Sequence, residues 1–595
     1  MAYSDSFPAI RPSFQFSADA GRLDPRISYS RSTTGSFYGK DKHLSSENLF
    51  AYSSPPTGWT LDSFTLTSGQ TAPDGSTNAV KLTEDTSGSE HRIYPYSSVT
   101  TSGGATTLSG YFKYIGRQWV MFRLNDGTTY RRVWFDIQNG ALGSAETGIT
   151  HSITASGNGY YKCVATIATS NTSYLPTIGG APANTGITYT GSGADAFYVW
   201  GLQYNNNVGS VLSETSGQIH REYAPTLQTA AINAPRFEFS ATDSASAAMG
   251  ESLGLLVEGQ TTNLLPNGAT GYNLSNAFSW NKINANVVQN AAIAPTGELE
   301  ATHFYEDTAT ATQQRFDVPV TVSAAAHTLS GYFKSAGRDE IIVRVANGGT
   351  NYWGKLTFST ETTSDAGNPF SSLSVTSVGN GWYRFTATTP TLTAGSTTIY
   401  INLSNGALNY DGDGYSGVLF YGLQFEANSF ASSVIATSGG TATRAADSAS
   451  AVTSDIGYTG GPVSIVAEGE GGRGSYPRLF SMGDSSSYLT FFRFSADAST
   501  STDYRFWVYD SGVKQADQIG EASVTKVAVS VDTNSIKSCG DGGVVRSDTA
   551  AVTPVLSTLR IGDQPTGGKH WNGHIKRLAL YGEALSDSNL QSLTK

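Results

Sequence analysis

Leu108-Ser109-Gly110-Tyr111-Phe112-Lys113 recurs as Leu329-Ser330-Gly331-Tyr332-Phe333-Lys334, 221 positions further along the chain. The same offset relates Trp59 to Trp280 and Arg123 to Arg344. The chain therefore carries one module twice, over residues 46–218 and 262–440. Duplication is typical of binding proteins, because two weak sites on one chain raise avidity without any new contact. The alternative is that the second copy only adds length and spacing.

Each copy contains the pattern of a β-hairpin. Residues 118–124 alternate with period two, 125–127 read Asn-Asp-Gly, and 131–137 alternate again. Val120, Phe122 and Leu124 correspond to apolar residues of the second copy, so we expect this side of the hairpin to face the core. Many short strands joined by tight turns predict a two-sheet β-sandwich, most simply a jelly roll.

Composition limits the classes of function. The 595 residues include 65 glycines and only 14% charged residues, and the formal net charge is −11. An acidic chain without a basic stripe is a poor partner for nucleic acid. The sequence offers no apolar segment long enough to cross a bilayer and no secretory signal, so we also expect no membrane insertion.

The motifs of the two copies resemble those of a known family. A Trp near the start of each copy, Gly379-Asn380-Gly381-Trp382-Tyr383-Arg384 and the closing Tyr421-Gly422-Leu423-Gln424-Phe425-Glu426 accompany the repeated segment. Together they resemble the carbohydrate-binding-module-like jelly rolls of bacteriophage fibre proteins. Residues 23–35, 227–237 and 254–265 resemble a small domain found near the start of many phage fibre and tail-tip proteins.

These resemblances imply a division of the chain. Residues 1–45 are expected to be a virion-anchoring segment with the first half of the small domain, and 219–261 the second half, so that jelly roll 46–218 is inserted between them. A plain string of domains is the alternative. Jelly roll 262–440 is followed by a linker, 441–454. Residues 455–595 resemble a concanavalin-A-like, laminin-G-type lectin domain that closes with a short helix capped by Ser586. The expected fold is an all-β, multidomain string of β-sandwiches.

No catalytic constellation is visible, and we expect no enzymatic activity. The stronger signal is a set of aromatic and charged residues on the side of the hairpin away from the core, where rings can stack on sugars and arginines can donate hydrogen bonds. Trp119 and Trp134 of the first copy are replaced by Glu340 and Thr357, for which Tyr352 or Trp353 substitutes. The alternative is that the tryptophans pack under a neighbouring loop or at a subunit contact. The candidate glycan-binding residues are Trp119, Arg123, Arg132, Trp134, Asp136, Arg344, Tyr352, Trp353 and Lys355.

Asp411 and Asp413 form a candidate calcium site, because their carboxylates lie in a glycine-rich turn. The first copy lacks both acids, which favours a turn that does not need metal. No other cofactor is expected.

We therefore expect a virion protein of a bacteriophage. It would be a homotrimeric tail fibre that binds host surface glycans and joins other virion proteins through its N-terminal segment. A capsid-attached fibre or a purely structural decoration is the alternative, and a glycan depolymerase is a further one.

Overall fold

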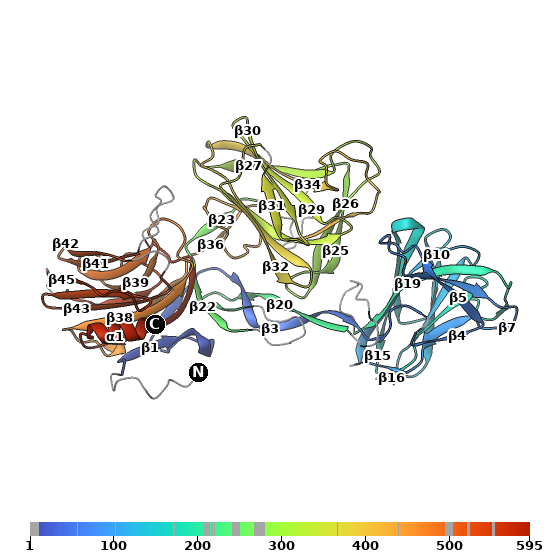
Figure 1. Ribbon diagram of the computed structural model, residues 1–595, viewed down its shortest axis with the longest axis horizontal. Coiled ribbons are helices and arrows are strands. Elements are labelled where there is room, and N and C mark those ends of the chain that lie inside the picture. The colour runs from blue at the N-terminus through green and yellow to red at the C-terminus, as the bar shows by residue number, and fades with distance from the viewer. Residues whose placement is uncertain are drawn as a thin grey trace.

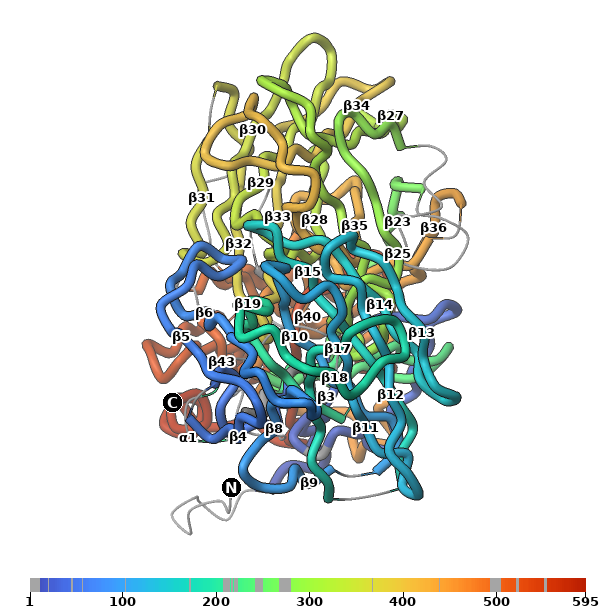
Figure 2. Tube along the Cα trace, turned by 90° about the vertical axis from the view of Figure 1, so that its right-hand side faces the viewer, coloured from blue at the N-terminus to red at the C-terminus, as the bar shows by residue number. Residues whose placement is uncertain are grey.

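The computed structural model describes residues 11–595 except 56, 102, 171–172, 207–214, 216–217, 219, 241–249, 267–279, 366, 438, 494–503, 521–523 and 550–553. The structure contains three β-sandwiches, with the first jelly roll at one end of the long axis and the C-terminal sandwich at the other (Figure 1). The second jelly roll lies between these two in Figure 1 and above both of them in Figure 2. The fold is all-β and multidomain, as the sequence predicts.

The C-terminal sandwich is built from segments that lie far apart in the sequence. One sheet has the order β21-β22-β47-β38-β43-β44-β45, with β1 also paired to β47. Its strands are β1 (Phe14–Ser17), β21 (Phe237–Phe239), β22 (Ser252–Val257), β38 (Val463–Glu470), β43 (Lys526–Asp532), β44 (Ser535–Gly540), β45 (Arg546–Asp548) and β47 (Gly573–Tyr581).

The facing sheet has the order β2-β37-β46-β39-β40-β41-β42. Its strands are β2 (Ser28–Ser30), β37 (Ser448–Val452), β39 (Arg478–Gly483), β40 (Tyr488–Arg493), β41 (Tyr504–Asp510), β42 (Val513–Ile519) and β46 (Thr558–Ile561). Helix α1 (Asp587–Thr594) packs on the first sheet, and the Ser586 hydroxyl accepts a hydrogen bond from the Asn589 N–H, as the cap prediction requires.

The small split domain expected around residues 10–45 and 219–261 does not form a separate body. Phe14 pairs with Leu580, and Leu255 pairs with Ile575, so both halves extend the sheet of the C-terminal sandwich. Their apolar side chains join its core, with Phe16 and Val257 each at most 2% exposed. These short segments supply too few apolar residues to form a hydrophobic core of their own. Their apolar side chains are instead buried in the core of the C-terminal sandwich.

A two-stranded ribbon carries the first jelly roll away from this sandwich. Strands β3 (Gly35–Asn48) and β20 (His220–Ala230) pair from Gly35↔Ala230 to Asn48↔His220. The first jelly roll lies at the far end of the ribbon (Figure 1). It is thus inserted between two segments that are neighbours in space.

The second jelly roll is inserted as well. Strand β23 (Thr261–Asn263) enters it and pairs with β36 (Ala442–Arg444), which leaves it. The expected linker 441–454 is therefore largely strand, because β36 and β37 both lie within it. One sandwich hosts both jelly rolls, whereas the sequence predicted insertion for the first jelly roll alone.

Each jelly roll consists of two six-stranded sheets. In the first, the orders are β14-β15-β10-β19-β6-β5 and β13-β12-β11-β17-β8-β4. Two short two-stranded sheets accompany them, one formed by β9 and β16 and the other by β7 and β18. The strands are β4 (Trp59–Asp62), β5 (Phe64–Gln70), β6 (Ala79–Glu84), β7 (Gly88–Ser89), β8 (Arg92–Pro95), β9 (Val99–Thr100), β10 (Gly104–Tyr114), β11 (Trp119–Asn125), β12 (Tyr130–Asp136), β13 (Ala141–Ala145), β14 (Ile149–Ser156), β15 (Tyr160–Thr169), β16 (Ser173–Tyr174), β17 (Thr177–Ala181), β18 (Tyr189–Thr190) and β19 (Asp195–Asn205).

In the second jelly roll the orders are β25-β26-β35-β28-β33-β32 and β24-β27-β34-β29-β30-β31. The strands are β24 (Asn281–Ile283), β25 (Ala285–Ile293), β26 (Leu299–Glu306), β27 (Arg315–Val322), β28 (Thr328–Ala336), β29 (Glu340–Asn347), β30 (Thr350–Thr357), β31 (Thr362–Asp365), β32 (Ser372–Gly379), β33 (Trp382–Thr388), β34 (Gly395–Ser404) and β35 (Gly417–Glu426). Val120, Phe122 and Leu124 are 0% exposed, which confirms the predicted core side of the hairpin.

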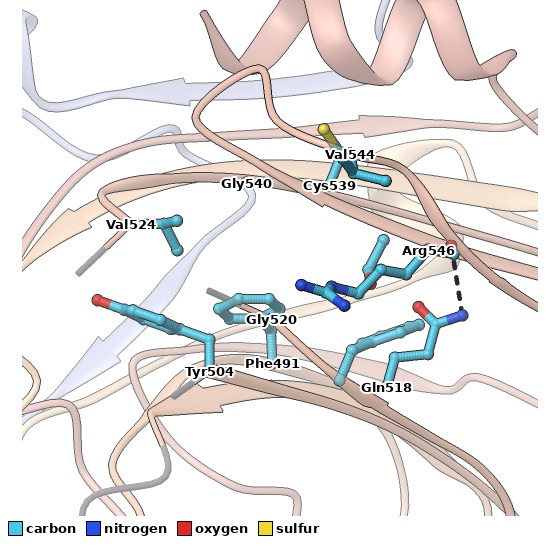
Figure 3. A pocket seen from close by; sticks show the side chains of 11 residues that line it. Phe491, Tyr504, Gln518, Gly520, Val524, Cys539, Gly540, Val544 and Arg546 are labelled. Carbon is cyan, nitrogen blue, oxygen red and sulfur yellow. Dashed lines mark hydrogen bonds between the residues drawn. The ribbon is translucent and has the colours of Figure 1, made fainter. Parts of the chain in front are cut away.

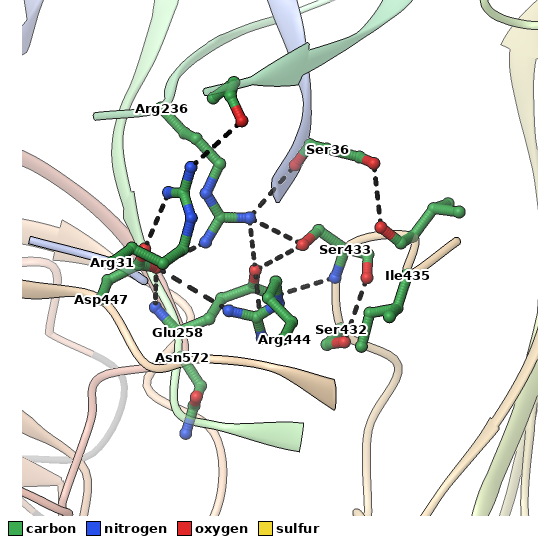
Figure 4. Close-up of polar contacts among 12 residues, drawn as sticks. Arg31, Ser36, Arg236, Glu258, Ser432, Ser433, Ile435, Arg444, Asp447 and Asn572 are labelled. Atoms are coloured by element: carbon green, nitrogen blue, oxygen red, sulfur yellow. Dashed lines mark hydrogen bonds and ion pairs between the residues drawn. The ribbon is translucent and has the colours of Figure 1, made fainter. Parts of the chain in front are cut away.

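A buried ionic cluster joins the second jelly roll to the C-terminal sandwich (Figure 4). Asp447 accepts hydrogen bonds from Arg31 at 3.1 Å and from Arg236 at 2.5 Å. Arg236 also donates to Glu258 at 2.7 Å and to the hydroxyl of Ser433, which belongs to the second jelly roll. We call this set the junction cluster; its members are Arg31, Arg236, Glu258, Arg444 and Asp447.

Candidate functional site

The outer face of the second jelly roll carries alternating rings and guanidinium groups. Arg344 on β29 lies opposite Trp353 on β30 and Tyr400 on β34. Its Cζ is 4.8 Å from the Trp353 ring centroid and 3.5 Å from that of Tyr400. Arg315 on β27 continues the row, with its Cζ 5.4 Å from the Tyr400 ring. We call Trp353, Arg344, Tyr400 and Arg315 the second-copy ladder.

The ladder combines stacking surface with hydrogen-bond donors. Its four side chains are half-buried, so their edges reach solvent while their positions are fixed by neighbours. Burial lowers the pKa of Arg344, and its Nε is buried without a hydrogen-bond partner. Arg315 donates to Gln313 at 2.7 Å and to Asp317 at 3.2 Å. Rings between cationic donors are the chemistry that a hydroxylated sugar ring needs.

The structure separates the four candidates of the second copy. Tyr352 pairs with Val345 and lies 6.5 Å from the Phe370 ring, on the core side, so it is not part of the outer face. Period-two alternation then places Trp353 outward beside Arg344. Lys355 shares the face and binds Glu340, with Nζ 2.5 Å from Oε2.

The hairpin register also corrects the residue correspondence between the copies. Trp119 pairs with Asp136 in the first copy, and Glu340 pairs with Thr357 in the second. Thr357 is therefore the counterpart of Asp136, and Lys355 is the counterpart of Trp134.

The equivalent face of the first copy has a different set of groups. Arg123 lies opposite Arg132, and its Cζ is 5.0 Å from the Tyr130 ring. Glu90 approaches Arg92 at 2.6 Å and Arg123 at 3.5 Å. The Cζ of Arg92 lies 5.5 Å from the ring of Tyr94. We call Tyr94, Arg92, Arg123 and Tyr130 the first-copy ladder.

The tryptophan candidates of the first copy are packed against neighbouring side chains and a loop. Trp134 is 3% exposed, and its Nε1 donates to the Gly186 carbonyl at 2.8 Å. It packs with Met121, Trp119 and Ile187, so the alternative that it lies under a neighbouring loop describes its position. These residues do not form an open stacking platform.

Two further candidates have partners within the first copy. Asp136 accepts hydrogen bonds from the side chains of Gln118 and Asn139, each at 2.8 Å. Arg132 lies 3.5 Å from Glu146.

The carboxylates of Asp411 and Asp413 accept hydrogen bonds from backbone N–H groups. Asp411 accepts from the Ala311 N–H at 2.7 Å, and Asp413 accepts from the Ser416 N–H at 2.7 Å. Asp413 also lies 3.3 Å from Arg338. Over the part of the chain that the structure describes, no group of three or more His, Cys, Asp or Glu side chains is placed to hold a metal ion. These contacts explain the two acids as turn-forming residues.

The C-terminal sandwich presents a third aromatic face that the sequence reasoning missed. Arg478 has its Cζ 3.8 Å from the Phe492 ring and 5.4 Å from the Trp507 ring, and burial lowers its pKa to about 10. Tyr488 and Tyr509 stack beside them at 4.8 Å between ring centroids. The alternation of aromatic residues over 504–509 was the available signal, because it gives β41 rings on its outer side.

The void between the two sheets of this sandwich is not a ligand site. Phe491, Tyr504 and Gln518 approach Cys539 and Arg546 across it (Figure 3). Its volume is about 20 Å³, which is room for a single water molecule.

Comparison with known proteins places one part of the chain. Residues 471–591 match the concanavalin A-like lectin/glucanases superfamily. The C-terminal sandwich is therefore concanavalin A-like, and from here we call it the lectin sandwich. No curated protein matches the chain.

A solved structure also matches the chain. The N-terminal CBM22-1-CBM22-2 tandem domain of Xyn10C from Paenibacillus barcinonensis matches with 12% identity and a TM-score of 0.20. The match covers 65% of this chain and 98% of that chain. None of the helices in the described part of the chain has the length and apolar character that crossing a bilayer requires.

Proposed function

We propose that this chain is a carbohydrate-binding protein that contacts glycans through several faces at once. The observation that carries the proposal is the second-copy ladder, in which Arg344 stands between the rings of Trp353 and Tyr400. The first-copy ladder and the aromatic face of the lectin sandwich supply further contacts. Because the three faces belong to one chain, weak binding at each raises the overall avidity.

The finer proposal is that the protein is a bacteriophage virion fibre that adsorbs to host surface glycans. It rests on the resemblance of residues 23–35, 227–237, 254–265 and the two repeated modules to phage fibre proteins. A homotrimeric tail fibre, joined to other virion proteins by its N-terminal segment, is the form we propose. Mass spectrometry of purified virions, with labelling by antibody in electron micrographs, tests this. Absence of the chain from virions contradicts it.

Glycan binding is tested with the full chain on a glycan array. Trp353→Ala removes one ring of the second-copy ladder, and we expect a loss of about 1–2 kcal/mol at that face, roughly five- to thirty-fold in affinity. Thr357→Ala, at the end of the same strand, is the matched control. Equal binding by wild type and Trp353→Ala to every glycan contradicts the assignment of this face.

Binding without chemistry is proposed over glycan depolymerisation. The second-copy ladder offers rings and guanidinium groups, which suit binding, whereas glycoside hydrolysis needs two carboxylates placed on either side of the scissile bond. Incubation of the purified chain with the polysaccharide that it binds, followed by a reducing-end assay, separates the two. Release of reducing ends contradicts the proposal.

A further inference from the structure

A cavity of about 340 Å³ lies where the second jelly roll meets the lectin sandwich. Asn428 and Phe430 line it from the jelly roll, and Arg444, Lys569 and His570 line it from the other side. This volume is at the lower end of the range for small-molecule sites, about 300–1,000 Å³. It is separate from both ladders, which lie on the outer faces of the jelly rolls.

Hydrogen bonds fix the wall of the cavity that lies opposite the jelly roll. Arg444 is 2% exposed and belongs to the junction cluster, and its Nη2 donates to the Gly259 carbonyl at 2.9 Å. Asn572 accepts from the Gly259 N–H at 2.8 Å and donates to the His570 carbonyl at 3.1 Å. Figure 4 shows Asn572 next to this cluster. The cavity is thus built on fixed groups.

The lining offers hydrogen-bond donors and no carboxylate. The Arg444 guanidinium lies 3.5 Å from Glu258 and 4.0 Å from Asp447 behind the lining, so its charge is already compensated. Lys569 has its Nζ 5.8 Å from the Tyr476 ring and forms no ion pair with the described residues, so it is the uncompensated cation of the lining. Phe430 supplies an apolar wall. His570 Nδ1 stands 3.6 Å from Asp563, which lies behind the lining. A pocket with an uncompensated lysine and one aromatic wall matches a ring that carries both C–H groups and a negative charge.

We propose that this cavity binds a carboxylated sugar of the uronic acid class. The carboxylate faces Lys569, and the sugar ring packs against Phe430. Because the walls come from two sandwiches, the bound sugar also stabilises their relative orientation. The site goes beyond the proposed function, since it needs neither ladder.

The test is calorimetric titration of the full chain with glucuronic acid, galacturonic acid and glucose. We expect a uronic acid to bind and glucose to bind at least tenfold more weakly. Lys569→Gln is expected to weaken uronic acid binding at least tenfold, and Phe430→Ala to weaken it several-fold. Lys537→Gln is the matched control and is expected to bind normally, because Lys537 pairs with Asp587 of helix α1 and does not line the cavity.

Two results overturn the proposal. One is equal affinity for glucose and for both uronic acids, which includes no binding of any of them. The other is unchanged uronic acid affinity in both Lys569→Gln and Phe430→Ala, with thermal unfolding showing that the variants are folded. Trp353→Ala distinguishes the two sites, because it weakens array binding through the ladder and leaves the cavity unaffected.

Discussion

Replacement of Asp447 by Asn tests whether the junction cluster holds the lectin sandwich together. The Asp447 side chain is 0% exposed. One oxygen accepts from Tyr29 at 2.5 Å and Arg31 at 3.1 Å, and the other accepts from Arg236 at 2.5 Å and the Glu258 N–H at 2.8 Å. Either orientation of an amide therefore turns its NH₂ toward two donors.

The magnitude follows from the charges that remain. In Asp447→Asn the junction cluster keeps its three buried arginines, but Glu258 is then its one remaining carboxylate. Removing one partner from a buried ion pair costs about 3–5 kcal/mol, because the other charge is left uncompensated. For a domain of roughly 150–250 residues, each kcal/mol shifts the Tm by about 2–4 °C, so we expect the Tm of the lectin sandwich to fall by about 6–20 °C.

Differential scanning calorimetry of the full chain measures this change. The first jelly roll stands at the far end of the ribbon, so its own transition is expected to stay in place and to serve as an internal reference (Figure 1). Asp587→Asn is the matched control, because Asp587 is 61% exposed and its pair with Lys537 is a surface ion pair worth about 0–1 kcal/mol. A Tm shift for Asp447→Asn no larger than that of Asp587→Asn refutes the argument.

Three other changes have defined outcomes. Burial opposes the charged form of Glu84, but hydrogen bonds from Arg117 and Tyr189 hold its pKa at about 2. The stabilisation is fully present above pH 4.5, the ordinary pKa of a glutamate, and is lost as the pH falls toward 2. The unfolding free energy of the first jelly roll, followed by tryptophan fluorescence, should therefore change less with pH over this range in Glu84→Gln than in wild type. Burial lowers the pKa of His303 to about 4. The unfolded chain therefore takes up a proton below pH 6.5, and the second jelly roll should lose stability between pH 6.5 and 4, as measured by urea unfolding. The loss should be smaller in His303→Asn, where only His327, whose pKa burial also lowers, still contributes. Replacement of residues 49–219 by a two-residue turn should leave the other two sandwiches folded, because Asn48 and His220 already pair; loss of their calorimetric transitions contradicts this.

Local patterns in the sequence predicted the sandwiches well. Alternation over 118–137 identified the hairpin and its core side, because strand periodicity is a property of neighbouring residues. The Ser586 cap was predictable for the same reason, since it needs only the next three residues. The repeat also located the outer face that carries Arg344 and Trp353.

Contacts between distant segments were not predictable in the same way. The pairing of Phe14 with Leu580 depends on which sheet edge is open, and no local pattern records that. Trp134 reads as an exposed ring in the hairpin, but the loop that contains Gly186 covers it. Tyr400 was missed because its strand, β34, lies far from the hairpin in sequence while it adjoins β29 in the sheet.

The pairing of β1 with β47 has a consequence for synthesis on the ribosome. The lectin sandwich receives its first strand at Phe14 and lacks its partner until Leu580 has emerged. Both jelly rolls are complete long before that point, and chains generally fold by domains as they emerge. We therefore expect the nascent chain to carry two folded jelly rolls while the apolar side chains of β1 are still exposed to solvent. Chaperone binding to the nascent chain should be strongest during this interval.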